Sequence, residues 1–314
     1  MSHARLLLRL GFGLLLWLGL SGCVPTQTIG TRPAPDVLGS IEAYLQRYQP
    51  GPTPRVFQTT RFFDRHGRLL AERWDEGRRT WVSLDRISKH LIDATIATED
   101  ASFYVNYGVD PVRIVGAALQ NAQQGQVVSG ASTITMQLAR NLFLGSDERY
   151  DQTMDRKLLE AGLAQELTAL FSKDELLEAY LNLLNYGHLA YGPEAAAQVY
   201  FGKSAAELTL AEATLLAGIP QRPADLDPLR NFAAAKARQR VVLDLMVRHG
   251  YLRPEQADAV FAEELVFNPA ADAQPVMAPH FVEYVAAELD RRLGAGASRR
   301  SGLQVTTTLD LDMQ

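Results

Sequence analysis

The chain is organised around the sequence Ile92-Asp93-Ala94-Thr95-Ile96-Ala97-Thr98-Glu99-Asp100-Ala101-Ser102-Phe103. At helical spacing, Glu99 falls on the same stripe as the apolar residues Ile96 and Phe103. Burying a carboxylate is costly unless it is paired or lines a cleft. The pattern therefore predicts that Glu99 faces a cleft or is held by a partner.

A second polar run follows at residues 130–141, which read Gly-Ala-Ser-Thr-Ile-Thr-Met-Gln-Leu-Ala-Arg-Asn. Between the two runs, Gly108 and the pair Asp110-Pro111 interrupt the helix. The connector at 112–119 is apolar except for Arg113. Two polar runs therefore flank one largely apolar segment.

The composition is that of a globular protein, with 314 residues, 47% of them apolar, and a formal net charge of -5. A chain of this size can bury a large core. The lack of net positive charge argues against nucleic acid as a partner. Cys23 is the single cysteine, so neither an intrachain disulfide nor a cysteine-rich metal site can form.

The two runs and three later motifs resemble the peptidoglycan glycosyltransferases, which are the polymerase domains of class A penicillin-binding proteins. The matching motifs are, in the family's order, Glu99-Asp100-x-x-Phe103-Tyr104 with Gly108-Val109-Asp110, residues 130–141, Arg156-Lys157-x-x-Glu160, Lys173-x-x-Leu176-Leu177-x-x-Tyr180-Leu181-Asn182 to Gly187, and Arg240-x-x-Leu243-x-x-Met246. Because they occur in order over about half of the chain, the resemblance is specific. It implies a mainly α, lysozyme-like fold in two lobes, with a small N-terminal β element.

Pattern and resemblance together divide the chain into five parts. We expect a lipoprotein-type signal peptide at 1–22, a flexible tether at 23–54, a small β-rich segment at 55–85, the glycosyltransferase domain at 86–266, and a linker at 267–314 toward a transpeptidase domain. We expect this sequence to lack that further domain, since no serine has lysine three positions later and neither Lys-Thr-Gly nor Lys-Ser-Gly occurs. The chain is then expected to be either the polymerase half of a longer protein or a naturally shortened one.

The first residues carry a targeting pattern. Arg5 and Arg9 precede an apolar run at 10–20, and Leu20-Ser21-Gly22-Cys23 resembles a bacterial lipobox. The pattern predicts cleavage before Cys23 and its acylation, which would hold the protein at the outer face of the cytoplasmic membrane. The alternative is an uncleaved signal anchor, although the apolar run is shorter than the roughly 20 residues that a spanning helix needs.

Spacing and caps predict a helical body. Ser88 is a candidate N-cap for the helix that carries Glu99, and Ser172 is one for the helix expected at 173–184. Further helices are expected at 153–170, 173–184, 208–216 and 233–246. In the β-rich segment, strands are expected near 56–57, 62–63, 69–70 and 81–82, with a turn at 64–67.

The connector at 112–119 has two interpretations. It is either a core helix or, as the resemblance implies, a jaw that dips into the bilayer where the lipid substrate lies. Residues 120–129 are polar and contain glycine, so they are expected to form a mobile loop over the cleft.

The resemblance implies that an acceptor hydroxyl attacks a lipid-linked sugar while a lipid pyrophosphate departs. A base must take the hydroxyl proton, and Glu99 matches the family's catalytic glutamate. The second carboxylate is Glu160, which would orient a basic side chain or a substrate hydroxyl. The departing pyrophosphate needs cations that are already in place. The candidates are Arg140, Arg149, Arg156 and Lys157.

Several of these assignments have a purely structural alternative. Arg156 and Lys157 could form surface ion pairs with Glu160, at helical spacing, worth only about 0.3 kcal/mol each. Other motif residues are assigned to substrate binding, namely Asp100, Ser132, Thr133, Gln137 and Asn141. Ser132 and Thr133 could simply cap the following helix, whose N-terminus would itself favour an anion, and the two roles do not exclude each other. The motif Tyr180-Leu181-Asn182 is interpreted as structural packing behind the cleft.

The sequence departs from the family at three places. Asn106 stands where histidine is usual, Met136 stands where glutamine is usual, and the segment between Asn141 and Arg156 is longer than usual. The first two departures bear on substrate contacts. The third makes Arg149 the least secure of the assigned cations.

The leading hypothesis is a membrane-tethered glycosyltransferase that polymerises lipid II into β-1,4-linked glycan. Its expected partners are lipid II, the growing strand, the membrane and cell-wall synthesis proteins, with moenomycin as inhibitor. By family analogy a divalent cation, Mg²⁺ or Mn²⁺, could assist the pyrophosphate, although no metal-ligand cluster is visible. The alternatives are a non-catalytic scaffold lipoprotein and a hydrolase that uses Glu99 with Glu160. The basic cluster argues against the hydrolase, because hydrolysing a glycan needs no pyrophosphate clamp.

Overall fold

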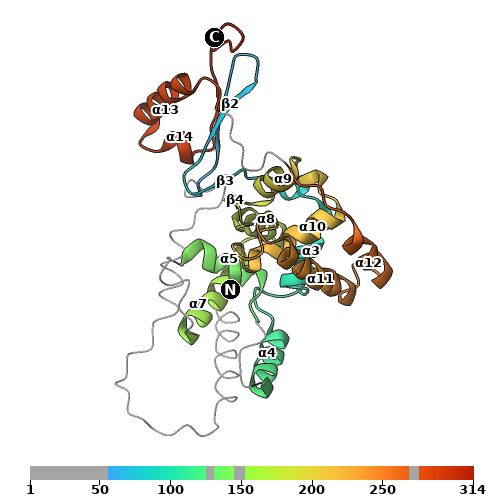
Figure 1. Ribbon diagram of the computed structural model, residues 1–314. Helices are drawn as coiled ribbons and strands as arrows, with labels where there is room; N and C mark the ends of the chain where they lie inside the picture. Colours follow the sequence, from blue (N-terminus) through green and yellow to red (C-terminus); the bar gives the residue numbers. More distant parts are fainter. Residues whose placement is uncertain (1–55, 125–130, 145–152, 269–275) are drawn as a thin grey trace. The chain divides into compact units, whose positions relative to one another are not determined.

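The computed structural model describes residues 56–124, 131–144, 153–268 and 276–314, and within these ranges the protein is mainly α-helical (Figure 1). The helices are α3 (Lys89–Glu99), α4 (Pro111–Gln124), α5 (Ile134–Phe143), α7 (Met154–Leu170), α8 (Lys173–Leu183), α9 (Pro193–Phe201), α10 (Leu210–Gly218), α11 (Phe232–Arg248), α12 (Pro254–Ala262), α13 (Pro279–Leu293) and α14 (Ala297–Arg300). The mainly α fold expected from the sequence is confirmed. The signal peptide, Cys23, the tether and Arg149 lie outside the described residues.

The hydrophobic core of the helical body forms where amphipathic faces meet. Helix α10 packs against α3 and α11, and α5 packs against α7 and α8. Leu91, Leu138, Leu163, Leu177 and Leu216 are each fully or almost fully buried in this core. Burying such a side chain stabilises the fold by about 1.5–3 kcal/mol. The elements that carry the motifs are therefore held by one continuous core.

The two serines predicted to be N-caps, Ser172 and Ser88, make different hydrogen bonds. Ser172 accepts from the backbone N–H of Glu175, and the Glu175 side chain accepts from the N–H of Ser172, so α8 begins with a capping box. Ser88 does precede α3, but its hydroxyl donates to the carbonyl of Leu208, 2.9 Å away, and makes no cap bond. The predicted boundary of α3 is confirmed, whereas Ser88 ties that boundary to a distant segment.

The strands of the described chain form two small sheets: β1 (Thr60–Phe63), β2 (Leu69–Arg73) and β5 (Gln304–Thr306) in one, and β3 (Arg78–Arg79) with β4 (Ala190–Tyr191) in the other. The predicted hairpin corresponds to β1 and β2, which pair antiparallel. No strand forms at 81–82, because Val82 pairs instead with the side chain of Asn182.

The segment expected to be a linker is folded in its described part. Strand β5 pairs parallel with β1, and Val282 and Ala286 of α13 pack with Phe62 and Leu70 in a second small hydrophobic cluster. Figure 1 shows α13 and α14, in red, beside the blue hairpin. The sequence did not predict this folded segment, because neither the hairpin nor the C-terminal elements bury much apolar area alone. Their apolar area is buried only when they pair with each other across more than two hundred residues.

Helix α4 covers the apolar connector and continues to Gln124, so the loop expected to start at residue 120 is helical in its first part. The side chains of Val112 and Val115 are 82% and 68% exposed. Such exposure does not fit the core-helix interpretation of this segment. Among the described residues, no helix combines the length and apolarity needed to cross a bilayer.

Candidate active site

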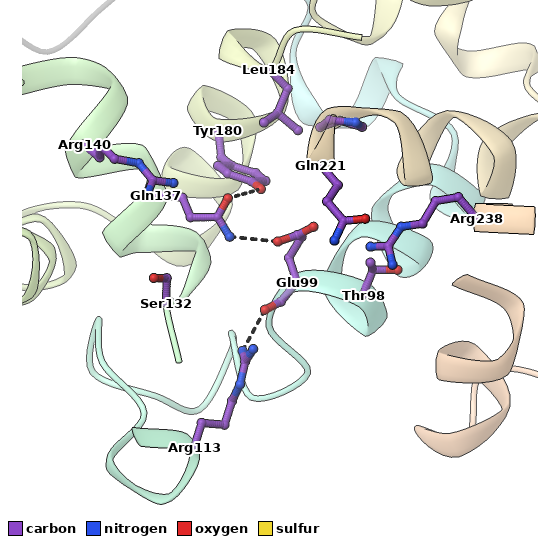
Figure 2. Close-up of a pocket in the computed structure, with 11 residues that line it drawn as sticks. Thr98, Glu99, Arg113, Ser132, Gln137, Arg140, Tyr180, Leu184, Gln221 and Arg238 are labelled. Carbon is purple, nitrogen blue, oxygen red and sulfur yellow. Dashed lines mark hydrogen bonds between the residues drawn. The ribbon is translucent and has the colours of Figure 1, made fainter. Parts of the chain in front are cut away.

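A pocket of about 390 Å³ opens between the helices that carry the motifs (Figure 2). Its lining combines side chains from α3, α4, α5, α8 and α11 with the 3-10 turn Ile219–Gln221. The lining residues are Thr98, Glu99, Arg113, Ser132, Gln137, Arg140, Tyr180, Leu184, Pro220, Gln221 and Arg238. The structure thus brings together Glu99, Ser132, Gln137 and Arg140 of the predicted site.

A hydrogen-bonded chain of three side chains orients Glu99. Burial, and secondly the charge of Glu99, raise the pKa of Tyr180 well above its ordinary value, so its hydroxyl stays protonated. That hydroxyl donates to Oε1 of Gln137 at 3.1 Å, which turns Nε2 of Gln137 toward Glu99. Nε2 donates to Oε2 of Glu99 at 2.8 Å. Tyr180 therefore does more than pack behind the cleft, because it sets which end of the amide meets the carboxylate.

Helix α7 presents the third motif as an ion-pair cluster. Glu160 is fully buried, and its carboxylate lies 2.7 Å from Lys157 Nζ, 3.5 Å from Arg156 Nε and 3.9 Å from Arg140 Nη1. Burial lowers the pKa of Lys157, and the hydrogen bond to Glu160 opposes that shift. Since three cations surround one anion, the cluster keeps an excess of positive charge. The alternative of weak surface pairs does not fit a fully buried carboxylate.

Ser132 connects that cluster to the pocket. Lys157 Nζ donates to Ser132 Oγ at 2.9 Å, and Ser132 lines the pocket beside Arg140. A hydroxyl that accepts from an ammonium group keeps its own O–H available as a donor. The pocket therefore holds, on the side of α5 and α7, donors suited to an anion.

Two residues assigned to substrate binding are instead used inside the protein. Thr133 is fully buried; its hydroxyl donates to the carbonyl of Gly108 at 2.6 Å and caps α5 by accepting from the N–H of Met136. Asp100 is also fully buried and does not line the pocket. Its carboxylate accepts from the N–H of Ile134 and the amide of Asn106. The capping interpretation thus holds for Thr133, and Asp100 serves as an internal connector.

The remaining residues assigned to substrate binding, and the two residues that depart from the family pattern, do not line the pocket. Asn141 and Arg156 are not among the lining residues, although Arg156 reaches Glu160. Neither Asn106 nor Met136 lines the pocket; Met136 is 5% exposed. These two departures therefore alter internal packing and hydrogen bonding rather than direct contacts in the pocket.

Sequence reasoning missed Arg238, which lines the pocket from α11. Its guanidinium lies near Glu99 and Gln221 in Figure 2; burial lowers its pKa, and the charge of Glu99 opposes that shift. The fifth motif pointed to Arg240, but that side chain pairs with Asp244 and Asp258 at the surface. Helical spacing gives only a weak signal for Arg238, which lies three positions after the buried Ala235 and four before the buried Val242.

In the sequence, Arg113 only interrupts the apolar connector, yet in the structure its side chain also lines the pocket. Its Nη1 donates to the backbone carbonyl of Glu99 at 2.7 Å, as the dashed line in Figure 2 marks. That carbonyl belongs to the last residue of α3, where helix carbonyls lack partners of their own. Arg113 thus joins the start of α4 to the end of α3 beside the carboxylate.

A resident metal ion finds no built site in the described ranges. Within them, no group of three or more His, Cys, Asp or Glu side chains could hold a metal ion. Mg²⁺ is usually held by one or two carboxylates together with substrate phosphates, whereas a dedicated all-protein site would need more oxygen ligands. The described residues therefore build no dedicated all-protein site for a divalent cation.

Comparison with known proteins agrees with this geometry. The family model described as Transglycosylase matches residues 66–247, more than half of the chain. The chain is 40% identical over 273 residues to penicillin-binding protein 2D of Bacillus subtilis (strain 168), covering 86% of this chain and 39% of that protein. It is 43% identical over 248 residues to penicillin-binding protein 1A of Escherichia coli (strain K12), covering 79% of this chain and 28% of that protein.

Among solved structures, the crystal structure of penicillin-binding protein 1A from Haemophilus influenzae matches with a TM-score of 0.47 and 27% identity, over 83% of this chain and 28% of that one. The chain thus spans between about a quarter and two fifths of the length of these relatives. The family match and the two identities carry the assignment. This chain belongs to the transglycosylase family, in the form found in class A penicillin-binding proteins.

Proposed function

We propose that the chain is a peptidoglycan glycosyltransferase that polymerises lipid II into β-1,4-linked glycan strands at the outer face of the cytoplasmic membrane. The observation that carries the proposal is a single oriented carboxylate in a pocket whose neighbouring wall is cationic. Transfer of a sugar from a lipid pyrophosphate needs a carboxylate that takes the proton of the acceptor hydroxyl. It also needs cations that stabilise the negative charge of the leaving group. Family membership supports the same reaction.

Glu99 is the general base in this proposal. Its Oε2 is held by Gln137, and its Oε1 has no hydrogen-bond partner among the described residues, so it can accept a proton from substrate. As the acceptor hydroxyl oxygen forms its bond to the donor's anomeric carbon, its proton passes to Glu99. A base placed in this way accelerates transfer by about 10²–10⁴-fold.

The cationic wall stabilises the leaving group. When the bond from the anomeric carbon to the phosphate oxygen breaks, the electron pair stays with the lipid pyrophosphate. Arg140 and the O–H of Ser132 meet that charge directly, and Lys157 acts behind Ser132. Because these donors are already held by Glu160 and the core, they need no reorganisation as charge develops.

The hydrolase alternative is less well supported. Glycoside hydrolysis usually needs two carboxylates that flank the scissile bond. Among the described residues that line the pocket, Glu99 is the only carboxylate. Glu160 is buried and engaged with cations, so it acts through Lys157 instead of on substrate.

Membrane attachment remains part of the proposal. Acylation at Cys23 would tether the chain, and the exposed Val112 and Val115 of α4 would enter the bilayer beside the lipid part of the substrate. Moenomycin and the growing glycan strand would occupy the pocket region, and cell-wall synthesis proteins would be partners.

The deciding experiment incubates the detergent-solubilised chain with lipid II and separates the products by size on a gel. Long strands that a muramidase digests to disaccharide units are expected. Absence of polymer under conditions where a known family member is active would refute the proposal. Release of soluble sugars from preformed glycan would favour the hydrolase.

A further inference from the structure

A buried polar network lies directly behind the pocket, centred on Asp100. This residue follows Glu99 and caps the C-terminal end of α3, and its side chain is fully buried. Its Oδ2 accepts from the backbone N–H of Ile134, the first residue of α5, at 3.2 Å. One carboxylate therefore connects the end of α3 to the start of α5.

Asn106 holds that carboxylate from the other side. Its Nδ2 lies 3.1 Å and 3.0 Å from the two carboxylate oxygens of Asp100. Its Oδ1 accepts from Lys173 Nζ, the first residue of α8, at 3.0 Å, and from the N–H of Gly108 at 3.1 Å. Because an amide donates at one end and accepts at the other, a single side chain satisfies an anion and a cation together.

The charged groups around Asn106 explain why a neutral side chain suits this position. Besides Asp100 and Lys173, Arg113 of α4 lies 3.7 Å from Asp100. Asp110 is connected to the network by Ser102. The Ser102 hydroxyl lies 2.6 Å from the Asp110 carboxylate and 3.0 Å from that of Asp100, and it can donate to only one of them at a time. An anionic side chain at position 106 would repel Asp100, and a cationic one would repel Lys173.

Gly108 keeps this network close to α7. Its φ is +86°, and a Cβ added there would lie 2.4 Å from the carbonyl oxygen of Ala164. Only glycine permits such an approach without strain. The carbonyl of Gly108 also accepts from Thr133, the N-cap of α5. The loop that carries Asn106 is thus pinned to both α5 and α7.

The network bears on Glu99 through the geometry of α5. Ile134 and Gln137 are one turn apart on that helix, and they bond to Asp100 and Glu99 respectively, which are neighbours in the chain. These two hydrogen bonds are parallel links between α3 and α5. If the link to Asp100 is lost, the first turn of α5 can shift and carry Gln137 away from Glu99.

We infer that Asn106 is a positioning residue, which holds the Asp100 carboxylate against the first turn of α5 and thereby keeps Gln137 on Glu99. Its effect on turnover rests on the proposed function, whereas its effect on α5 does not. Misplacement of a catalytic group by about 1 Å can cost about 10²-fold in rate. Replacement of Asn106 should therefore act mainly on kcat and little on KM for lipid II.

The first test compares Asn106→Ala with Asn185→Ala. Asn185 is exposed and makes the same kind of turn, accepting from the N–H of Gly187 at 2.8 Å, but its amide contacts no carboxylate among the described residues. In Asn106→Ala we expect faster amide hydrogen exchange in residues 131–138 and a fall in kcat of about 10²-fold. Asn185→Ala should change neither. Unchanged exchange and kcat in Asn106→Ala would overturn the inference.

The second test uses Asn106→Asp, which keeps the shape but replaces the donor with an oxygen. When ionised, the new carboxylate repels Asp100, whereas its protonated form can donate to Asp100. On acidification the pair takes up a proton, and a donor to Asp100 is restored. The activity of the variant relative to wild type should therefore rise as the pH falls from alkaline to mildly acidic.

A flat activity ratio across pH would overturn the inference, and this result decides even if Asn106→Ala fails to fold. If wild type itself makes no polymer, the proposed function fails, and the exchange of residues 131–138 in the folded variants alone decides the role of Asn106.

Discussion

The molecule holds two glutamates in opposite surroundings. Glu99 ends α3 and lines the pocket, where a neutral amide donates to one oxygen and leaves the other facing the cavity. Glu160 lies within α7, is fully buried, and contacts three cations. The same residue type thus has surroundings suited to proton exchange at Glu99 and to holding cations at Glu160.

This comparison indicates that the surroundings of each carboxylate, and not its residue type, determine its role. A carboxylate that faces a cavity can take a proton from substrate without breaking internal bonds. An ion-paired carboxylate cannot be neutralised without leaving its cations uncompensated. The predictions below test this division, and each is designed to separate a change in rate from a change in stability.

The largest effect is expected for Glu99→Gln. The substitution keeps size and hydrogen-bonding reach but removes the base, so lipid II turnover should fall by about 10²–10⁴-fold. The melting temperature should hold or rise slightly, because the carboxylate has no cationic partner within salt-bridge distance among the described residues. Polymerisation and thermal unfolding are measured on the same sample. A variant with near wild-type turnover would show that the base lies elsewhere.

Glu160→Gln should behave in the opposite way with respect to stability. Removing one partner of a buried ion pair typically costs about 3–5 kcal/mol, because the remaining charges lose compensation. The free energy of unfolding, measured by denaturant titration, should fall by that order, with Glu99→Gln as the matched control. If both variants unfold alike, the contrast between the two glutamates fails.

Arg140→Ala tests the cation that reaches the pocket itself. Loss of a preorganised donor to developing charge should reduce kcat by about 10²-fold. Stability should change little, since Arg140 is the most distant of the cations around Glu160, at 3.9 Å. Arg240→Ala is the control, because that arginine pairs with Asp244 and Asp258 on the surface of α11. Equal rates for the two variants would place the leaving-group contact elsewhere.

The smallest effect is expected for Tyr180→Phe. It removes one hydrogen bond that orients Gln137, worth about 0.5–1.5 kcal/mol, so turnover should fall by about 2–10-fold. Tyr186→Phe is the matched control, because Tyr186 is equally buried and its hydroxyl has no hydrogen-bond partner among the described residues. Turnover in the control should be unchanged. If both variants lose activity equally, aromatic packing and not the hydrogen bond explains the role of Tyr180.

The sequence by itself determined whatever depends on neighbours along the chain. The helix at 173–183 with its capping box at Ser172 and the ion pairs of Lys157 and Arg156 with Glu160 follow from contacts between residues three or four positions apart. The hairpin around the turn at 64–67 follows from pairs that begin six positions apart. Such contacts exist in any helix or hairpin with this pattern. Family motifs added Glu99 and Gln137 as members of one site.

Only the tertiary structure decided which side chains meet across large separations. It brought Arg238 into the pocket with Glu99, withdrew Thr133 and Asp100 into internal bonds, and paired β5 with β1. These outcomes depend on how separate elements pack. The residue type alone does not decide them, because a hydroxyl or a carboxylate can form a hydrogen bond with a backbone group as well as with a substrate. Packing of α3, α5 and α7 around one core chose between those uses, because every buried polar group had to find its partner there.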